Sequence, residues 1–149
     1  MFMLEQRIQQ QFFDSADLVV RTAEPLVRPV AEAAQAIVGC LTGGGKLLVY
    51  GHGGSRGLAI YLADAMVGRF ERERPGLATI RIGESAAPLA AQIGALGSPG
   101  DLLVLLAANA ADDLLPAEAV AHAHAKEMSV VALLGAPSDA VADSLTETD

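Results

Sequence analysis

The chain has 149 residues, of which 52% are hydrophobic, and it carries a formal net charge of -8 at pH 7. This length suits a single domain, residues 1–149, and the apolar content is sufficient for a core, so the composition excludes a disordered chain. The acidic balance argues against direct nucleic-acid binding, which needs a basic surface. Polar residues interrupt every apolar run before it could cross a bilayer, and the N-terminus lacks the apolar stretch of a secretory signal. These features predict a cytoplasmic protein without a membrane segment.

The N-terminal part, residues 1–44, is expected to form two amphipathic helices. Apolar residues recur at helical spacing over residues 4–19 and again over residues 26–41, after Pro25. Phe12, Phe13 and Leu18 give the first helix an apolar face broader than one contact needs. This breadth indicates self-association, and coverage of one face of a sheet is the alternative.

Residues 46–70 have the pattern of a strand, a glycine loop and a helix. An apolar run ends at Gly51, two more glycines follow, and Ser55 stands where a helix N-cap belongs. Such a loop brings free N–H groups and the positive end of the helix dipole close to a ligand, so the expected ligand is an anion. Arg56 lies in the first helical turn, and its positive charge also favours an anionic ligand. The candidate binding residues are His52, Gly53, Gly54, Ser55 and Arg56.

Two alternatives for this loop stay open. In the first, Ser55 only caps the helix, while His52 and Arg56 face water. In the second, the loop cradles the pyrophosphate of a nucleotide and Glu84 meets its ribose. The dinucleotide fingerprint needs a third glycine where Arg56 stands, and a hydrolase phosphate loop needs a lysine that the segment lacks. A nucleotide-binding protein is therefore the less favoured alternative.

The remaining chain alternates between strand and helix patterns. Helical patterns occupy residues 85–96 and 114–126, and strand patterns occupy residues 77–82, 101–107 and 129–134. This alternation predicts an α/β fold over residues 45–149, with a doubly wound parallel sheet of about four strands. Ligands of such sheets bind at the carboxyl ends of the strands, where the glycine loop falls.

The glycine loop and the segment that follows it resemble a known family. The run GHGGS at residues 51–55, together with AMVGRF at 65–70 and ERERPGL at 71–77, resembles the sugar isomerase (SIS) family. Two branches come closest, the phosphoheptose isomerases and the DnaA-initiator-associating protein DiaA, although these relatives usually have Asn where His52 stands. The resemblance implies a flavodoxin-like strand order and N-terminal helices that join subunits into a homodimer or homotetramer. The relatives continue into a fifth strand and a C-terminal helix, both of which we expect residues 1–149 to lack.

The chemistry that the resemblance assigns to the isomerases does not carry over. Their histidine metal ligand and glutamate base correspond to Tyr61 and Ala65. Their hydroxyl-rich phosphate loop corresponds to residues 107–113, which contain no hydroxyl and end in two carboxylates, Asp112 and Asp113, interpreted as helix caps. We therefore expect a non-catalytic SIS-like protein without metal or cofactor that binds sugar phosphates weakly. The resemblance to DiaA implies the replication initiator as a possible protein partner, and a phosphoheptose isomerase is the alternative.

Two further histidines are candidate metal ligands by residue type. His122 and His124 lie two apart in a predicted helix, so their side chains point to nearly opposite sides. Helical metal ligands are spaced three or four apart. Both histidines are therefore predicted to be surface residues.

Overall fold

The computed structural model describes residues 1–83, 85–109, 114–135, 139–146 and 149. The chain forms two compact units, residues 1–35 and residues 36–149. The second unit contains the sheet and the candidate binding loop.

The sheet is parallel and has four strands in the order β2-β1-β3-β4. Its strands are β1 (Leu47–Gly51), β2 (Thr79–Ile82), β3 (Leu102–Ala107) and β4 (Ser129–Leu134). Their apolar runs suit the interior of a parallel sheet, which is covered on both faces. The register places Leu48 beside Leu103 and Leu103 beside Val130, and all three side chains are buried. The predicted fold class and flavodoxin-like strand order are confirmed.

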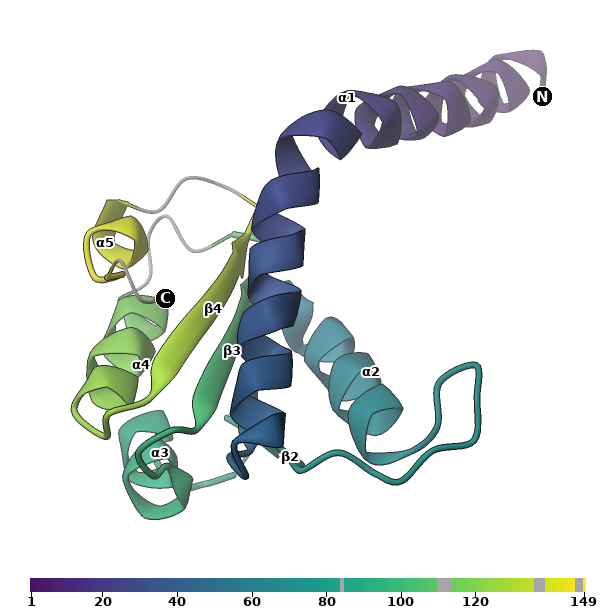
Figure 1. The fold of residues 1–149 in the computed structure, drawn as a ribbon. Helices are drawn as coiled ribbons and strands as arrows, with labels where there is room; N and C mark the ends of the chain where they lie inside the picture. Colours follow the sequence, from purple (N-terminus) through teal and green to yellow (C-terminus); the bar gives the residue numbers. More distant parts are fainter. Residues whose placement is uncertain (84, 110–113, 136–138, 147–148) are drawn as a thin grey trace. The chain divides into compact units, whose positions relative to one another are not determined.

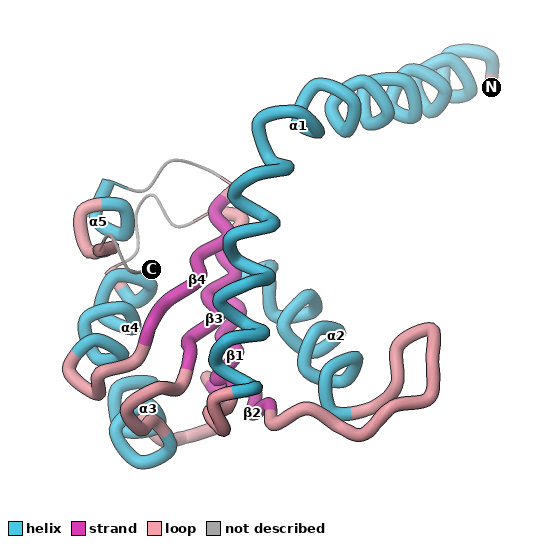
Figure 2. The backbone as a smooth tube through the Cα atoms, viewed as in Figure 1, coloured by secondary structure: helices cyan, strands magenta, loops and turns pink. Residues whose placement is uncertain are grey.

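Helices cover both faces of this sheet (Figures 1 and 2). On one face, α2 (Arg56–Val67) contacts β1 and β2. On the other, α4 (Leu115–His124) contacts β3 and β4, and α3 (Leu89–Leu96) packs against α4. The short helices η1 (Gly53–Ser55) and α5 (Asp139–Ala142) complete the unit. The helix α3 begins later than the predicted residue 85 because Pro88 takes its N-cap position and disfavours helical backbone at the residue before it.

The N-terminal part forms one helix, α1 (Phe2–Thr42), so the prediction of two helices was wrong. Pro25 and Pro29 both lie inside this helix. Proline's fixed φ is compatible with a helix, but it removes an N–H group and leaves the carbonyl four residues earlier without that partner. The carbonyls concerned belong to Arg21 and Pro25, which are exposed residues where water can supply the missing hydrogen bond.

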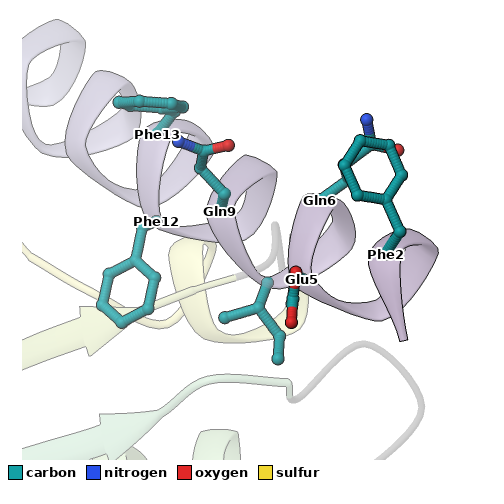
Figure 3. Close-up of a pocket in the computed structure, with 7 residues that line it drawn as sticks. Phe2, Glu5, Gln6, Gln9, Phe12 and Phe13 are labelled. Carbon is teal, nitrogen blue, oxygen red and sulfur yellow. The ribbon is translucent and has the colours of Figure 1, made fainter.

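The N-terminal unit, residues 1–35, leaves large apolar side chains exposed. Phe12 is 73% exposed and Phe13 is 62% exposed, and Figure 3 shows them pointing to opposite sides of the helix. A hollow of about 710 Å³ lies beside them and is also lined by Phe2 and Ile8. Exposed apolar area of this breadth is typical of an interaction surface, so self-association remains a prediction. Within the described part of the chain, no helix is long and apolar enough to cross a membrane.

A buried carboxylate ties the amino ends of two strands together. Asp101, at the start of β3, is 4% exposed and accepts hydrogen bonds from the N–H groups of Lys46 (2.9 Å) and Ser98 (2.8 Å). The ammonium group of Lys46 lies 2.5 Å from the same carboxylate. Burial alone would raise the pKa of Asp101, but the hydrogen bonds and charge of Lys46, with the bond from Ser98, outweigh burial and lower it.

Candidate functional site

The candidate site is the loop between β1 and α2, at the carboxyl end of a central strand. From β1 the chain crosses to β2 on one side and later returns to β3 on the other, so the loop lies at the topological switch point of the sheet. The N–H group of His52 donates to the carbonyl of Leu106 on β3 (2.8 Å), and the N–H of Ser55 donates to the carbonyl of His52 (2.9 Å). The backbone of the loop is therefore tied both to the sheet and to itself.

Two glycines in this loop expose their backbone donors. Gly53 adopts a φ of 53°, a left-handed conformation that glycine accepts without strain. Gly53 and Gly54 are exposed, and within the described residues their N–H groups make no hydrogen bond. Arg56 is also exposed and forms no ion pair with any described residue. Adjacent N–H donors beside a guanidinium group form an arrangement that can hold an anion.

Ser55 has a different role from the one its position suggested. It occupies the N-cap of α2, but its side chain makes no capping bond. Its hydroxyl is buried, 2% exposed, and accepts a hydrogen bond from the N–H of Ala108 (2.9 Å), just after β3. Ser55 therefore joins the loops that follow β1 and β3. Sequence reasoning missed this contact because the partner lies 53 residues away.

His52 is half-buried and contacts a residue that sequence reasoning missed. The hydroxyl of Tyr50 lies 3.2 Å from Nδ1 of His52, and the two rings meet edge to face with centroids 6.2 Å apart. In the sequence, Tyr50 is the last residue of the apolar run before Gly51 and carries no signal of this contact beyond its spacing from His52. Residues two apart in a strand point to the same face.

The metal site that the resemblance assigns to the isomerases does not fit the described residues. Tyr61 is 64% exposed on α2, and Ala65, one turn further on, offers no metal-binding atom. Among the residues that the structure describes, no three His, Cys, Asp or Glu side chains gather as a metal ion would need. Glu84, Asp112 and Asp113, which entered the sequence predictions, lie outside the described residues.

The prediction of two surface histidines holds for His122 and fails for His124. His122 is exposed, but the side chain of His124 is only 27% exposed and its Nε2 lies 2.9 Å from Oδ2 of Asp149. The Asp149 carboxylate, 3% exposed, also accepts hydrogen bonds from the N–H groups of Thr146 and Val130. Burial would raise the pKa of Asp149, but these hydrogen bonds and His124 lower it. His124 therefore anchors the C-terminal residues to the fold.

Comparisons with known proteins agree with this architecture. The SIS domain model matches residues 11–135. The phosphoheptose isomerase of Methylibium petroleiphilum is 46% identical, covering 100% of this chain and 80% of its own length, and that of Laribacter hongkongensis is 36% identical, covering 98% and 81%. The solved phosphoheptose isomerase of Francisella tularensis superposes with a TM-score of 0.87 at 32% identity, covering 97% of this chain and 82% of that one. These names agree with the isomerase branch of the resemblance, whereas the DiaA branch remains a prediction. The chain belongs to the SIS domain family.

Proposed function

We propose that this chain binds a phosphorylated sugar at the β1–α2 loop and that the phosphate lies against Gly53, Gly54 and Arg56. The observation that carries the proposal is the pair of exposed glycines at the switch point of the sheet, whose N–H groups make no hydrogen bond within the described residues, followed by the exposed Arg56 at the start of α2. Phosphate oxygens are acceptors, and a helix N-terminus favours negative charge. The names of the relatives suggest the class of sugar, a seven-carbon sugar phosphate.

The affinity for the sugar phosphate is expected to be weak because the loop after β3 offers few hydrogen-bond donors to the phosphate. Ala108 and Asn109 follow β3 and carry no hydroxyl, and the N–H of Ala108 is already bonded to Ser55. Each missing charge-assisted hydrogen bond lowers the binding free energy by about 1.5–3 kcal/mol. A dissociation constant in the millimolar range, roughly 1 mM, is therefore expected for sedoheptulose 7-phosphate.

The first test is a substitution of the guanidinium group. Arg56→Gln should weaken the binding of sedoheptulose 7-phosphate about tenfold in calorimetry, because a charge-assisted bond is replaced by a neutral one. Arg72→Gln is the matched control, since Arg72 is also exposed and its side chain makes no hydrogen bond or ion pair with the described residues. Equal affinities for the two variants would contradict the placement of the phosphate.

Isomerisation is the second candidate function, and the names of the relatives favour it over the non-catalytic interpretation of the sequence. Moving a proton between carbons requires a positioned base. Ala65 cannot act as one, and Tyr61 is an exposed phenol on the same helix. We therefore propose binding without turnover. An isomerase assay on sedoheptulose 7-phosphate, run with and without zinc, decides between the two, because turnover above background establishes the isomerase.

We also propose that protein contacts are part of the function, beginning with self-association through α1. The exposed side chains of Phe12, Phe13 and Leu18 are the basis of this proposal. Light scattering at micromolar concentration should show an oligomer for the wild type and a smaller species for Phe12→Asp, while Gln11→Asp, on the same exposed helix, serves as the control. A monomeric wild type would contradict self-association through α1. The replication initiator remains a proposed partner, and a pull-down from the source organism tests it.

A further inference from the structure

The turn that carries the two glycines of the β1–α2 loop is bonded to the end of β3 on both sides. Before the glycines, the N–H group of His52 donates to the carbonyl of Leu106 (2.8 Å). After them, the hydroxyl of Ser55 accepts a hydrogen bond from the N–H group of Ala108 (2.9 Å). The glycines between these two bonds are therefore held from both sides by the same stretch of chain.

Ser55 differs from its neighbours in the loop because its side chain is covered. The residue is 2% exposed, whereas the two glycines before it and Arg56 after it are exposed. A hydroxyl buried to this extent offers almost no surface to a ligand, and its oxygen already accepts the bond from Ala108. The N–H group of Ser55 is used as well, because it closes the turn on the carbonyl of His52 (2.9 Å). These bonds fit a residue that shapes the turn.

The position of Ala108 is also set by the end of β4. The N–H group of Gly135 donates to the carbonyl of Ala107 (2.9 Å). A Cβ atom at Gly135 would lie 2.5 Å from the carbonyl oxygen of Ala108 and 3.0 Å from its Cα atom. Both are backbone atoms, so a side chain at Gly135 would displace the backbone whose N–H group is bonded to Ser55. The ends of β1, β3 and β4 therefore form one connected frame.

We propose that Ser55 is a positioning residue: its bond to Ala108 holds the two glycine N–H groups in the arrangement that binds phosphate, and Ser55 itself does not touch the ligand. This inference rests on the proposed function. It also gives Gly135 a part in phosphate binding, because a displacement of Ala108 would reach the glycines through Ser55.

The expected size of the effect follows from pre-organisation. A loop that is already held in its binding conformation loses less conformational freedom when the ligand arrives, so its affinity is higher. Without the Ser55 hydroxyl, the turn keeps the bond between His52 and Leu106, so it should stay folded but move more freely. Ser55→Ala should therefore weaken the affinity for sedoheptulose 7-phosphate about three- to tenfold, the usual effect of one hydrogen bond.

Hydrogen exchange and nitrogen-15 relaxation of the backbone amides test the positioning role without any ligand. In the wild type, the Ala108 amide should exchange slowly although the residue is exposed. In Ser55→Ala it should exchange about tenfold faster, and the two glycine amides should become more mobile. Ser144→Ala is the control, because it removes a serine hydroxyl that is bonded to a carbonyl of α5, and it should change none of these signals. Unchanged amides in Ser55→Ala would overturn the proposal, because a serine that only touched the ligand would have no effect in its absence.

A double-mutant cycle tests the path from Gly135. By calorimetry, Gly135→Ala alone should weaken the affinity for sedoheptulose 7-phosphate about three- to tenfold. In the Ser55→Ala background it should have no effect on affinity, because Ala108 is then no longer bonded to the turn. Urea denaturation separates this from a general loss of structure, since the destabilisation by Gly135→Ala should persist in both backgrounds.

Equal affinity losses for Gly135→Ala in the two backgrounds would overturn the path through Ser55. The ligand-free amide measurement decides the role of Ser55 even if Gly135→Ala does not fold. It also decides that role if the wild type does not bind the sugar phosphate, in which case the proposed function fails.

Discussion

Replacing Asp101 by alanine is expected to lower the free energy of unfolding by about 3 kcal/mol. The substitution removes the acceptor of two buried backbone N–H groups, those of Lys46 and Ser98, and the partner of the Lys46 ammonium. A buried donor left without a partner costs about 1–3 kcal/mol, whereas the half-exposed Lys46 can turn to water. Most of the expected loss therefore comes from the backbone groups.

Urea denaturation at pH 7 measures this loss, with Asp64→Asn as the control. Asp64 is exposed on α2 and its side chain makes no hydrogen bond with the described residues, so its replacement should change the unfolding free energy by less than about 0.5 kcal/mol. A loss below about 1 kcal/mol for Asp101→Ala would contradict the structural role of this carboxylate.

The same carboxylate gives the protein a defined sensitivity to acid. The pKa of Asp101 is lower in the folded protein than in the unfolded chain, so the unfolded chain binds the proton more readily. Its stabilisation is therefore complete above the unfolded value of about 3.9 and is lost as the pH falls through the lower folded value. In Asp101→Asn this component of the pH dependence should be absent.

The second large effect is expected at Gly51, where β1 meets the start of α2. A Cβ atom at this position would lie 2.6 Å from the carbonyl oxygen of Ser55, 2.8 Å from Cβ of Ala59 and 2.8 Å from Cα of Arg56. Two of these contacts are with backbone atoms, which cannot move without shifting the helix. Gly51→Ala should therefore destabilise the protein by about 3 kcal/mol and displace the binding loop.

Gly54→Ala provides the matched control for this prediction. A Cβ atom at Gly54 meets nothing within 4 Å, and its φ is not in the left-handed region. The same addition of one methyl group, three residues along the same loop, should change the unfolding free energy by less than about 0.5 kcal/mol. Thermal denaturation of the two variants in parallel measures this difference. Equal melting temperatures would contradict the prediction for Gly51.

The sequence predicts the sheet well because its signal is local. The apolar run at 129–134 matches β4 at both ends, and the run at 101–107 differs from β3 by one residue, since Asp101 turns its carboxylate to the preceding loop. The N-terminal helix was predicted less well because proline usually ends a helix, through a lost hydrogen bond and a ring clash with the carbonyl four residues earlier. In α1 the two carbonyls concerned belong to exposed residues, where water can supply the missing hydrogen bonds.

The candidate site was predicted by position but not by contact. Glycines after a strand indicate an anion loop, and the structure places His52, Gly53 and Gly54 between β1 and α2 and Arg56 at the first position of α2. Their role in binding an anion stays a prediction. The partner of Ser55 could not be predicted, because the Ala108 N–H comes from a different strand and is brought near only by the pairing of β1 with β3. The contact of Tyr50 with His52 was missed for a similar reason, since the space for the Tyr50 ring depends on Gly83, directly after the neighbouring strand β2.

The central claim is that the N–H groups of Gly53 and Gly54 hold the phosphate of a sugar. The most direct measurement is a titration of the nitrogen-15 labelled protein with sedoheptulose 7-phosphate, following the backbone amide signals, with inorganic phosphate, NAD and ATP in parallel. The amide signals of Gly53 and Gly54 are expected to shift most and to saturate in the millimolar range, roughly 1 mM, with the sugar phosphate and more weakly with phosphate alone. Amide signals of these two glycines that stay fixed at saturating sugar phosphate, or that move only with a nucleotide, would contradict it.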